Sequence, residues 1–348
     1  MTEARKTLWY TADAPFFRLS GFCFRKKGEP FRRFEAGVPL PPPVDSLSNH
    51  TPGGQLAFMT DSSFIRIRFA PRLESHLGVN TRIGAAGFDL YMGKPGGKQY
   101  FCGVTRLKLG ENAFDLMLTD GVEQGMMEYT INFPLYSGVE YLEIGFDEKA
   151  SFSLPTPWTD ERPIVIYGTS IIHGGCANRP GMLLTNILSR RLNRPFLNFG
   201  FSGKGRGEAE VFTQLARISE PLMYLLDYGP NVKAAAMEKT LPEGIDILRR
   251  NHPQVPILVV SKHHYNTEIV QTGSLKGRLE DVLLMTAFQK KEVARRRRQG
   301  DKNIHFASGD WSYMNDWTEF TVDGVHPTDL GFYMQARMIE KHIRKYLK

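Results

Sequence analysis

The chain has 348 residues, a formal net charge of +7 and 41% apolar residues. This composition is that of an ordinary globular protein and excludes an intrinsically disordered or fibrous chain. No apolar stretch approaches the roughly 18 residues that a membrane-spanning helix needs, so we expect no membrane association. The N-terminal residues lack the apolar segment of a signal peptide. This favours a cytoplasmic protein, although a trimmed secreted chain would look the same.

Neither the cysteines nor the positive charge indicates a metal or a nucleic acid. The cysteines are scattered and odd in number, without the spacing of a metal site or a disulfide framework: Cys23, Cys102 and Cys176. We therefore expect no metal and no cofactor. Four consecutive arginines, residues 295–298, supply much of the net charge. Because no aromatic residues are interleaved with them, they favour a solvated helix end over a nucleic-acid site. The sequence leaves the oligomeric state open.

The N-terminal half predicts short β-strands. Residues 64–69 alternate apolar and basic side chains, which is typical of a half-buried strand. Segments 87–91, 129–133 and 139–146 are similar and are separated by turns rich in glycine and proline. Such strands without long helical patterns predict an all-β sandwich or jelly roll. The proline-rich stretch 155–158 marks a boundary, giving a β-domain over 1–158 and a second domain over 159–348.

The second half alternates strands and helices. Apolar strands are predicted at 164–167, 196–199, 222–226, 257–260 and 304–306. Helices are predicted near 182–192, 208–218, 242–250, 279–298 and 328–346. Strands that are apolar on both faces and alternate with helices predict an α/β fold with a covered parallel sheet. Functional sites in such folds lie at the carboxyl ends of the strands.

Ser170 follows the first of these strands, and Gly168 permits a tight exit from it. The hydroxyl group would then lie at the carboxyl edge of the sheet, beside the N-terminus of the next helix. Backbone N–H groups there stabilise developing negative charge. A serine in this position is either a nucleophile or a cap for the helix, and the motif alone does not choose between the two.

The next strand ends carry candidate hydrogen-bond donors. The glycine-rich turn 198–205, which contains Gly203, exposes backbone N–H groups suited to an oxyanion. A phosphate site is disfavoured because no G-x-x-x-x-G-K-[ST] string occurs. Asn231 follows the third strand and offers an amide donor, although asparagines at strand ends also cap loops. His263 and His264 follow the fourth strand; without a carboxylate partner, they are interpreted as loop or pocket-lining residues rather than metal ligands.

Asp323 and His326 are separated by three positions across a predicted turn that leads into the last helix. A carboxylate at this spacing fixes the tautomer of a histidine and stabilises its imidazolium form during proton transfer. The pair alone is also compatible with a structural role. Serine is a weak nucleophile that needs a base, and the base needs an orienting carboxylate. The combination of this pair with Ser170 therefore predicts a nucleophilic hydrolase.

Taken together, the motifs resemble the SGNH (GDSL-like) hydrolase superfamily, which is named after a serine, a glycine, an asparagine and a histidine. The segments that carry the resemblance are 167–171 (YGTSI), 198–203 (NFGFSG), 226–231 (LDYGPN) and 323–326 (DGVH). In the N-terminal half, residues 87–91 (GFDLY) resemble the GxDLY signature of the β-domain that precedes this type of catalytic domain. Two positions depart from the usual pattern: Thr169 stands where many members have aspartate, and Pro230 and Val232 flank the asparagine.

The resemblance implies a flavodoxin-like parallel sheet and acyl transfer to water. Ser170 would be the nucleophile, His326 the general base and Asp323 its orienting carboxylate. The backbone N–H groups of Ser170 and Gly203, together with the Asn231 amide, would form the oxyanion hole.

The same resemblance leads us to expect substrate contacts from two further residues, Arg179 in the loop after the nucleophile segment and Tyr228 in the asparagine segment. The expected substrate is a small-molecule or oligosaccharide ester with a short acyl chain, acetyl above all. Thioesters and lysophospholipids stay open, as does a non-catalytic carbohydrate-binding protein with the same fold. An α/β-hydrolase is disfavoured, because G-x-S-x-G would require glycine where Ile172 stands.

Overall fold

The computed structural model describes residues 6–72, 78–121, 125–270 and 278–347. The chain forms two compact units, each built from segments that are discontinuous in sequence. The first, here called the β unit, comprises Met1–Glu35, Ser48–Glu161 and Asn178–Pro195. The second, the α/β unit, comprises Ala36–Leu47, Arg162–Ala177 and Phe196–Lys348. The segment that follows the nucleophile candidate in sequence therefore belongs to the β unit.

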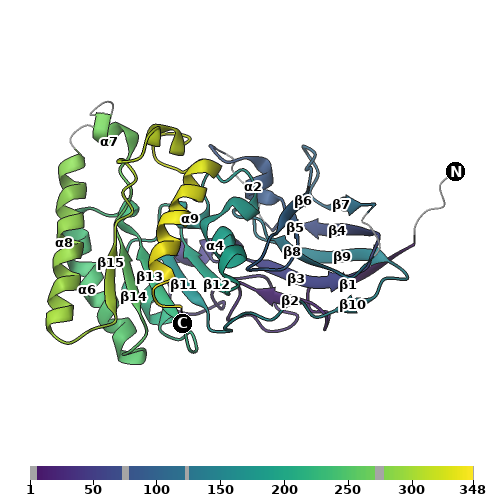
Figure 1. The fold of residues 1–348 in the computed structure, drawn as a ribbon, viewed down its shortest axis with the longest axis horizontal. Helices are drawn as coiled ribbons and strands as arrows, with labels where there is room; N and C mark the ends of the chain where they lie inside the picture. Colours follow the sequence, from purple (N-terminus) through teal and green to yellow (C-terminus); the bar gives the residue numbers. More distant parts are fainter. Residues whose placement is uncertain (1–5, 73–77, 122–124, 271–277, 348) are drawn as a thin grey trace. The chain divides into compact units, whose positions relative to one another are not determined.

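Two antiparallel sheets form the β unit (Figure 1). The first has the order β1-β9-β4-β7, with β1 (Thr7–Thr11), β4 (Phe64–Ala70), β7 (Phe114–Asp120) and β9 (Tyr141–Asp147). The second has the order β10-β3-β8-β5-β6, with β2 beside β3. Its strands are β2 (Arg18–Ser20), β3 (Gln55–Thr60), β5 (Asp89–Met92), β6 (Tyr100–Val104), β8 (Met127–Asn132) and β10 (Phe152–Ser153). The unit also contains α2 (Arg82–Ala86), the 3-10 helix η1 (Pro180–Met182) and α4 (Leu184–Leu192).

Strand β4 shows how the sequence pattern produces the sandwich. Its alternate residues Ile65 and Ile67 are fully buried in an apolar cluster to which both sheets contribute. The intervening Arg66 and Arg68 point away from the core and both bond to Asp115 on β7, at 2.6 and 2.8 Å. A period of two thus places one face of the strand in the core and the other in solvent. The predicted β-sandwich is confirmed.

The α/β unit is built on a parallel sheet with the order β12-β11-β13-β14-β15 (Figure 1). Its strands are β11 (Ile164–Gly168), β12 (Phe196–Gly200), β13 (Met223–Asp227), β14 (Ile257–Val260) and β15 (Ile304–Ala307). In order of their appearance along the chain this is 2-1-3-4-5, the flavodoxin-like arrangement that the resemblance implied. Every residue of the three strands β11, β12 and β13 is buried, as expected for a sheet covered on both faces.

The α/β unit also contains helices and 3-10 helices, most of which lie between these strands in sequence. They are α1 (Pro42–Leu47), α3 (Ser170–His173), α5 (Ala209–Leu215), η2 (Gly229–Asn231), α6 (Ala234–Asn251), α7 (Asn266–Val270), α8 (Leu279–Arg298), η4 (Trp317–Phe320) and α9 (Asp329–Ile343). The prediction was wrong about the start of α6, which it placed at Pro242 because proline favours a first helical turn. The residues before it, from Ala234 onward, are mostly strong helix formers, so they extend the helix and leave Pro242 inside it.

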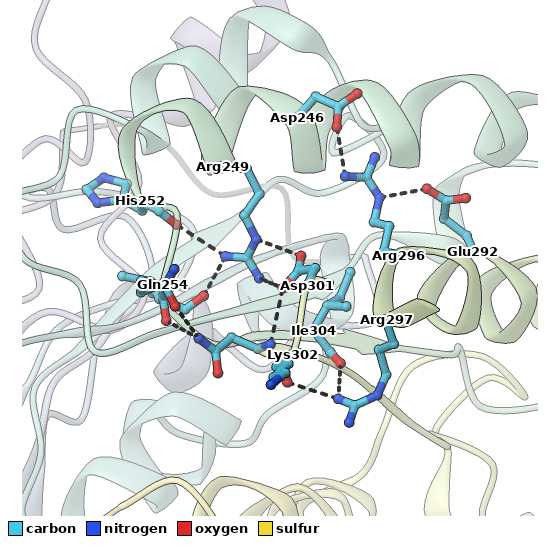
Figure 2. A network of polar contacts seen from close by, with 12 residues as sticks. Asp246, Arg249, His252, Gln254, Glu292, Arg296, Arg297, Asp301, Lys302 and Ile304 are labelled. Carbon is cyan, nitrogen blue, oxygen red and sulfur yellow. Dashed lines mark hydrogen bonds and ion pairs between the residues drawn. The ribbon is translucent and has the colours of Figure 1, made fainter. Parts of the chain in front are cut away.

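The run of four arginines lies at the end of α8 (Figure 2). Two of the four form more bonds to the protein than a solvated helix end would. Arg296 is 8% exposed and bonds to Glu292 on its own helix and to Asp246 on α6, each at 2.7 Å. Arg297 donates to the backbone carbonyls of Lys302 and Ile304 at the start of β15. The arginines therefore link α8 to α6 and β15, which explains the run without a nucleic-acid partner.

Among the residues that the structure describes, none of the helices is both long and apolar enough to cross a membrane.

Candidate active site

Ser170 begins the short helix α3 directly after β11. Thr169 is the N-cap of this helix, and its Oγ1 accepts a hydrogen bond from the Ile171 backbone N–H at 3.3 Å. Gly174, with φ of +102°, ends the helix in the left-handed region that favours glycine. Because Thr169 is the cap, the Ser170 hydroxyl is not needed for capping. Of the two roles that the sequence left open for the serine, the capping role thus belongs to Thr169.

The Ser170 hydroxyl instead meets His326. Its Oγ lies 2.9 Å from His326 Nε2, and His326 Nδ1 lies 2.8 Å from Asp323 Oδ2. Both His326 and Asp323 lie in the turn before α9, and His326 follows Ser170 by 156 residues. The three side chains are partly exposed, with 24% of His326 and 30% of Asp323 accessible. A substrate can therefore reach the Ser170 hydroxyl, which His326 connects to Asp323.

Asp323 is held in one orientation by its own turn. Its Oδ1 accepts the backbone N–H groups of Val325, at 3.0 Å, and His326, at 2.7 Å. Burial raises the pKa of Asp323, but the hydrogen bonds and charge of His326 outweigh it, so the pKa lies below the ordinary value of a carboxyl group. Asp323 is therefore ionised at neutral pH, and its Oδ2 fixes the histidine tautomer with the proton on Nδ1. That tautomer leaves Nε2 free to accept a proton from Ser170.

The turn that carries this pair is supported from the segment after β14. His263 Nε2 lies 2.8 Å from the carbonyl oxygen of Val325, and the Asn266 backbone N–H donates to the Gly324 carbonyl at 3.1 Å. The His263 ring is buried and stacks on Trp311, with 4.2 Å between ring centroids. Burial lowers the pKa of His263 to about 3, so it is a neutral donor to this carbonyl. No pattern in the sequence indicated that this histidine supports the turn.

The glycine-rich turn begins where β12 ends. The Phe201 N–H donates to the Gly168 carbonyl at 3.0 Å, which ties the turn to the strand before Ser170. A Cβ at position 205 would lie 2.0 Å from that same Gly168 oxygen, so only glycine fits there. Gly203 is exposed and has φ of +67°. Its backbone N–H can thus be presented at the surface of the same sheet edge as Ser170.

Asn231, at the end of η2, contacts this turn. Its Nδ2 donates to the Gly205 carbonyl at 3.1 Å and lies 3.5 Å from the Phe201 carbonyl. The structure therefore brings the predicted asparagine to the predicted glycine turn, where it fixes the turn's backbone. The sequence left two roles open for this asparagine, a support of a loop and a donor to an oxyanion, and this contact is of the first kind.

Two buried polar residues complete the support of the turn. Asn198 donates to the Ile172 carbonyl at 2.6 Å and accepts the Gly200 N–H at 2.9 Å, so it links β12 to α3. His173 Nδ1 accepts the Ser202 N–H at 3.3 Å, which places the proton of a neutral ring on Nε2. Both side chains hold the backbone of the candidate oxyanion hole against the nucleophile helix.

Tyr228 lies elsewhere than expected. Its side chain is 1% exposed and packs against Tyr167 and Phe212, while its hydroxyl lies 3.0 Å from Thr240 Oγ1 on α6. Tyr228 follows the last residue of β13, and its ring packs toward α5, which carries Phe212. A substrate contact from this side chain is therefore not supported; it is a core residue of the α/β unit.

Arg179 belongs to the β unit. Its Nη1 lies 2.8 Å from Asp89 Oδ2 and also bonds to the Tyr91 hydroxyl, and its guanidinium lies over the Phe101 ring at 4.1 Å. The Gly181 backbone N–H donates to the same Asp89 oxygen at 2.8 Å. The aspartate and tyrosine of the GxDLY-like segment therefore anchor the loop that carries Arg179.

In the described part of the chain, histidine, cysteine and carboxylate side chains form no group of three or more that could hold a metal ion.

Comparisons with known families match both parts of the chain. Residues 161–344 match the model of the GDSL-like lipase/acylhydrolase family, and residues 7–152 match the model of the N-terminus of SGNH-hydrolase-type esterases. The first match covers more than half of the chain. The protein belongs to the GDSL-like lipase/acylhydrolase family. The resemblance inferred from the sequence motifs is thereby confirmed.

Solved structures agree with this family assignment. A GDSL-like lipase from Bacteroides ovatus shares 30% sequence identity over 98% of each chain, with a TM-score of 0.87. A salicylyl-acyltransferase from a tetracycline biosynthetic pathway matches 98% of each chain at 17% identity, with a TM-score of 0.76. A family two carbohydrate esterase from Clostridium thermocellum, solved with cellohexaose, covers 85% of this chain and 93% of its own at 13% identity, with a TM-score of 0.58. The last two share the fold alone. A comparison with curated protein sequences finds no match.

The structure explains one departure of this GDSL-like hydrolase from the usual motif. Where many SGNH hydrolases have aspartate before the serine, threonine supplies the N-cap of the nucleophile helix. Threonine and aspartate both accept a backbone N–H in this position. The replacement thus preserves the local geometry of Ser170.

Proposed function

We propose that this GDSL-like hydrolase is a serine esterase that cleaves short-chain acyl esters, acetyl esters above all, on carbohydrate substrates. The observation that carries the proposal is the contact of 2.9 Å between Ser170 Oγ and His326 Nε2 in a chain of interactions that ends at Asp323. Membership of a lipase/acylhydrolase family supports the reaction class. The β unit and the sugar-bound fold relative support a carbohydrate as the alcohol part.

In the proposed reaction, His326 Nε2 takes the hydroxyl proton of Ser170 while Ser170 Oγ forms a bond to the ester carbonyl carbon. Asp323 stays ionised and stabilises the imidazolium that results. Collapse of the tetrahedral intermediate breaks the bond to the alcohol oxygen, which receives the proton from His326. Water then attacks the acyl-enzyme by the same steps and releases the carboxylic acid.

The negative charge of each tetrahedral intermediate needs donors close to the serine. We assign this role to the backbone N–H groups of Ser170 and Gly203, with the Asn231 amide as the third donor. The position of Ser170 at the first residue of α3 supports its part, because the first N–H groups of a helix have no partner within it. The loss of one such donor typically raises the barrier by about 2.7–4 kcal/mol.

The test compares p-nitrophenyl esters from acetate to palmitate with acetylated xylan and acetylated oligosaccharides. We expect the highest kcat/KM with acetate and the release of acetate from at least one sugar ester. Ser170→Ala is the control and should abolish turnover while the protein stays folded. If the wild-type enzyme and Ser170→Ala were equally inactive on every ester, the esterase proposal would be overturned. A maximum at long acyl chains would instead favour a lipase or lysophospholipase.

A further inference from the structure

A pocket of about 400 Å³ adjoins the candidate oxyanion hole within the α/β unit. Its walls come from the segment 230–233 before α6, from residues 262–268 after β14, and from the start of α8. Asn231, which fixes the glycine turn, is part of the first wall. The volume lies in the range of pockets that hold small molecules. One wall of the pocket therefore contains a residue that also bonds to the glycine turn.

The second wall is connected to the triad. The segment that contains Lys262 and Tyr265 also contains His263 and Asn266, whose bonds hold the turn between Asp323 and His326. Residues that line the pocket thus alternate along the chain with residues that hold the turn of Asp323 and His326.

The acidic side chains of the pocket are engaged by the protein itself. Glu268 is 1% exposed; its Oε1 bonds to Lys262 Nζ at 2.7 Å and its Oε2 accepts the Tyr265 backbone N–H at 2.9 Å. Asp281 on α8 accepts the backbone N–H of Ala234, the first residue of α6, at 3.2 Å. Glu268 is thus paired with Lys262, and Asp281 is bonded to the start of α6.

Two cations of the pocket, Lys233 and Arg278, have no such partner. Both are exposed, and within the described residues neither forms an ion pair with a carboxylate. They are the N-cap residues of α6 and α8, and neither side chain caps its helix. A cation at this end of a helix opposes the helix dipole, so helix stability does not explain their placement. With Lys262 they give the lining three positive and two negative side chains, a net charge of +1 (3 − 2).

We propose that this pocket binds an anionic group of the substrate, a carboxylate or a group of similar charge, on the ester cleaved at Ser170. Because the proposed substrate is an acetylated carbohydrate, we assign the anion to the alcohol part, as in an acetylated uronic acid. An anion on the acyl part would use the same chemistry. This inference rests on the proposed function and names its substrate class.

The alcohol side is tested with a matched pair of sugars, acetylated methyl galactoside and acetylated methyl galacturonate. The acyl side is tested with p-nitrophenyl butyrate and mono-p-nitrophenyl succinate. For each pair we measure the ratio of kcat/KM for the acidic ester to that for the neutral one. We expect a ratio above one for the sugar pair, and a fall of about tenfold in the double variant Lys233→Met/Arg278→Met, since exposed ion pairs are individually weak.

The matched control is Lys291→Met/Arg298→Met, which removes two exposed cations of α8 that do not line the pocket. This control should leave both ratios unchanged. A ratio above one only for the succinate pair would place the anion on the acyl part and overturn our assignment to the alcohol. Ratios that do not exceed one in either pair, or that are the same in the wild type and the pocket variant, would overturn the anion pocket.

A binding measurement separates this inference from the esterase proposal. Calorimetry with methyl galacturonate and Ser170→Ala protein requires no turnover. If no ester were hydrolysed but the galacturonate bound, and the pocket variant lost that binding, the esterase proposal would fail while the pocket stood. If neutral esters were hydrolysed, but galacturonate did not bind and acidic esters were not preferred, the anion pocket would be overturned while the esterase proposal stood.

Discussion

Asp89 and Arg179, which are 90 residues apart in the sequence, form an ion pair with 2.8 Å between Oδ2 and Nη1. The carboxylate of Asp89 is inaccessible to solvent, and Asn132 and the Gly181 N–H also donate to it. Oδ2 of this buried carboxylate therefore joins the GxDLY-like strand to the loop after α3, while Oδ1 is bonded to Asn132 on the neighbouring strand β8. This gives the motif a physical role, which is to hold residues 179–181 in place.

We expect Asp89→Ala to destabilise the protein by about 3–5 kcal/mol, because it leaves the Arg179 charge partly buried without its partner. The measurement is the free energy of unfolding from urea denaturation. The matched control is Asp115→Ala, which removes a carboxylate that binds Arg66 and Arg68 on the solvent side of β4. It should cost about 0–1 kcal/mol. Equal costs for the two variants would contradict the anchoring role of Asp89.

The triad predicts a specific kinetic effect of Asp323→Asn. An asparagine keeps the shape but no longer favours the Nδ1 proton of His326, so we expect kcat to fall by about 10³–10⁴ with little change in KM. Glu319→Gln, an exposed carboxylate of η4, is the control and should behave like the wild type. Unchanged turnover in Asp323→Asn would remove this residue from the mechanism.

Asn231 supports the glycine turn, and we propose that its amide is also a donor to the oxyanion. We expect Asn231→Ala to lower kcat by about 10²-fold or more, since either loss weakens the oxyanion hole. Asn251, the last residue of α6, donates a similar hydrogen bond from its amide to the Ala216 carbonyl. The control variant Asn251→Ala should leave kcat unchanged. If both variants retained full kcat, Asn231 would have neither role.

His263 is expected to act only through the turn that it supports. His263→Phe retains a ring to stack on Trp311 but removes the donor to the Val325 carbonyl. We expect kcat to fall about tenfold and the free energy of unfolding to fall by about 1–2 kcal/mol. His252→Phe removes a corresponding bond of 3.0 Å to the Ala216 carbonyl. The two variants should be similarly destabilised, but only His263→Phe should lose kcat; a loss in both would indicate a general effect of lower stability.

Asp227, the last residue of β13, makes stability depend on pH. Burial raises its pKa to about 7, above the value of about 3.9 in an unfolded chain. The unfolded state therefore loses its proton first as pH rises, and the free energy of unfolding falls between about pH 4 and pH 7 by an amount on the order of a few kcal/mol. Asp227→Asn stays neutral, so we expect it to be more stable than the wild type at pH 8, with no such gain at pH 4. Thermal unfolding at both values measures this, and an equal effect of the substitution at the two values would contradict it.

The positions of the strands could be predicted because they depend on local sequence patterns. The alternation in β4 and the apolar runs of the parallel strands are properties of neighbouring residues, and each was located to within one or two positions. The start of α6 was missed because a local rule about proline competes with the helix propensity of the eight residues before it. Strand order within the sheets depends on pairing between distant segments, and only the family resemblance indicated it.

The residues that are proposed to do the chemistry could be predicted from the sequence. The residues that hold them in position could not. Ser170, Asp323 and His326 were predicted from short motifs, and the structure brings their side chains within hydrogen-bond distance of one another. His263, His173 and Asn198 support backbone groups in the folded chain, and such contacts have no local pattern in the sequence. Tyr228 was misplaced because strand-end position does not reveal which face of the sheet a side chain takes.

The two units are each built from several separate segments of the chain, and this limits which parts of the chain can be exchanged. The chain passes from one unit to the other after residues 35, 47, 161, 177 and 195, so no single cut separates them. A recombination event that exchanged only the N-terminal half would bring in a new partner for Arg179 in place of Asp89, and new surroundings for all of Asn178–Pro195. We therefore expect such an exchange to be tolerated only where the incoming half supplies a carboxylate in the place of Asp89.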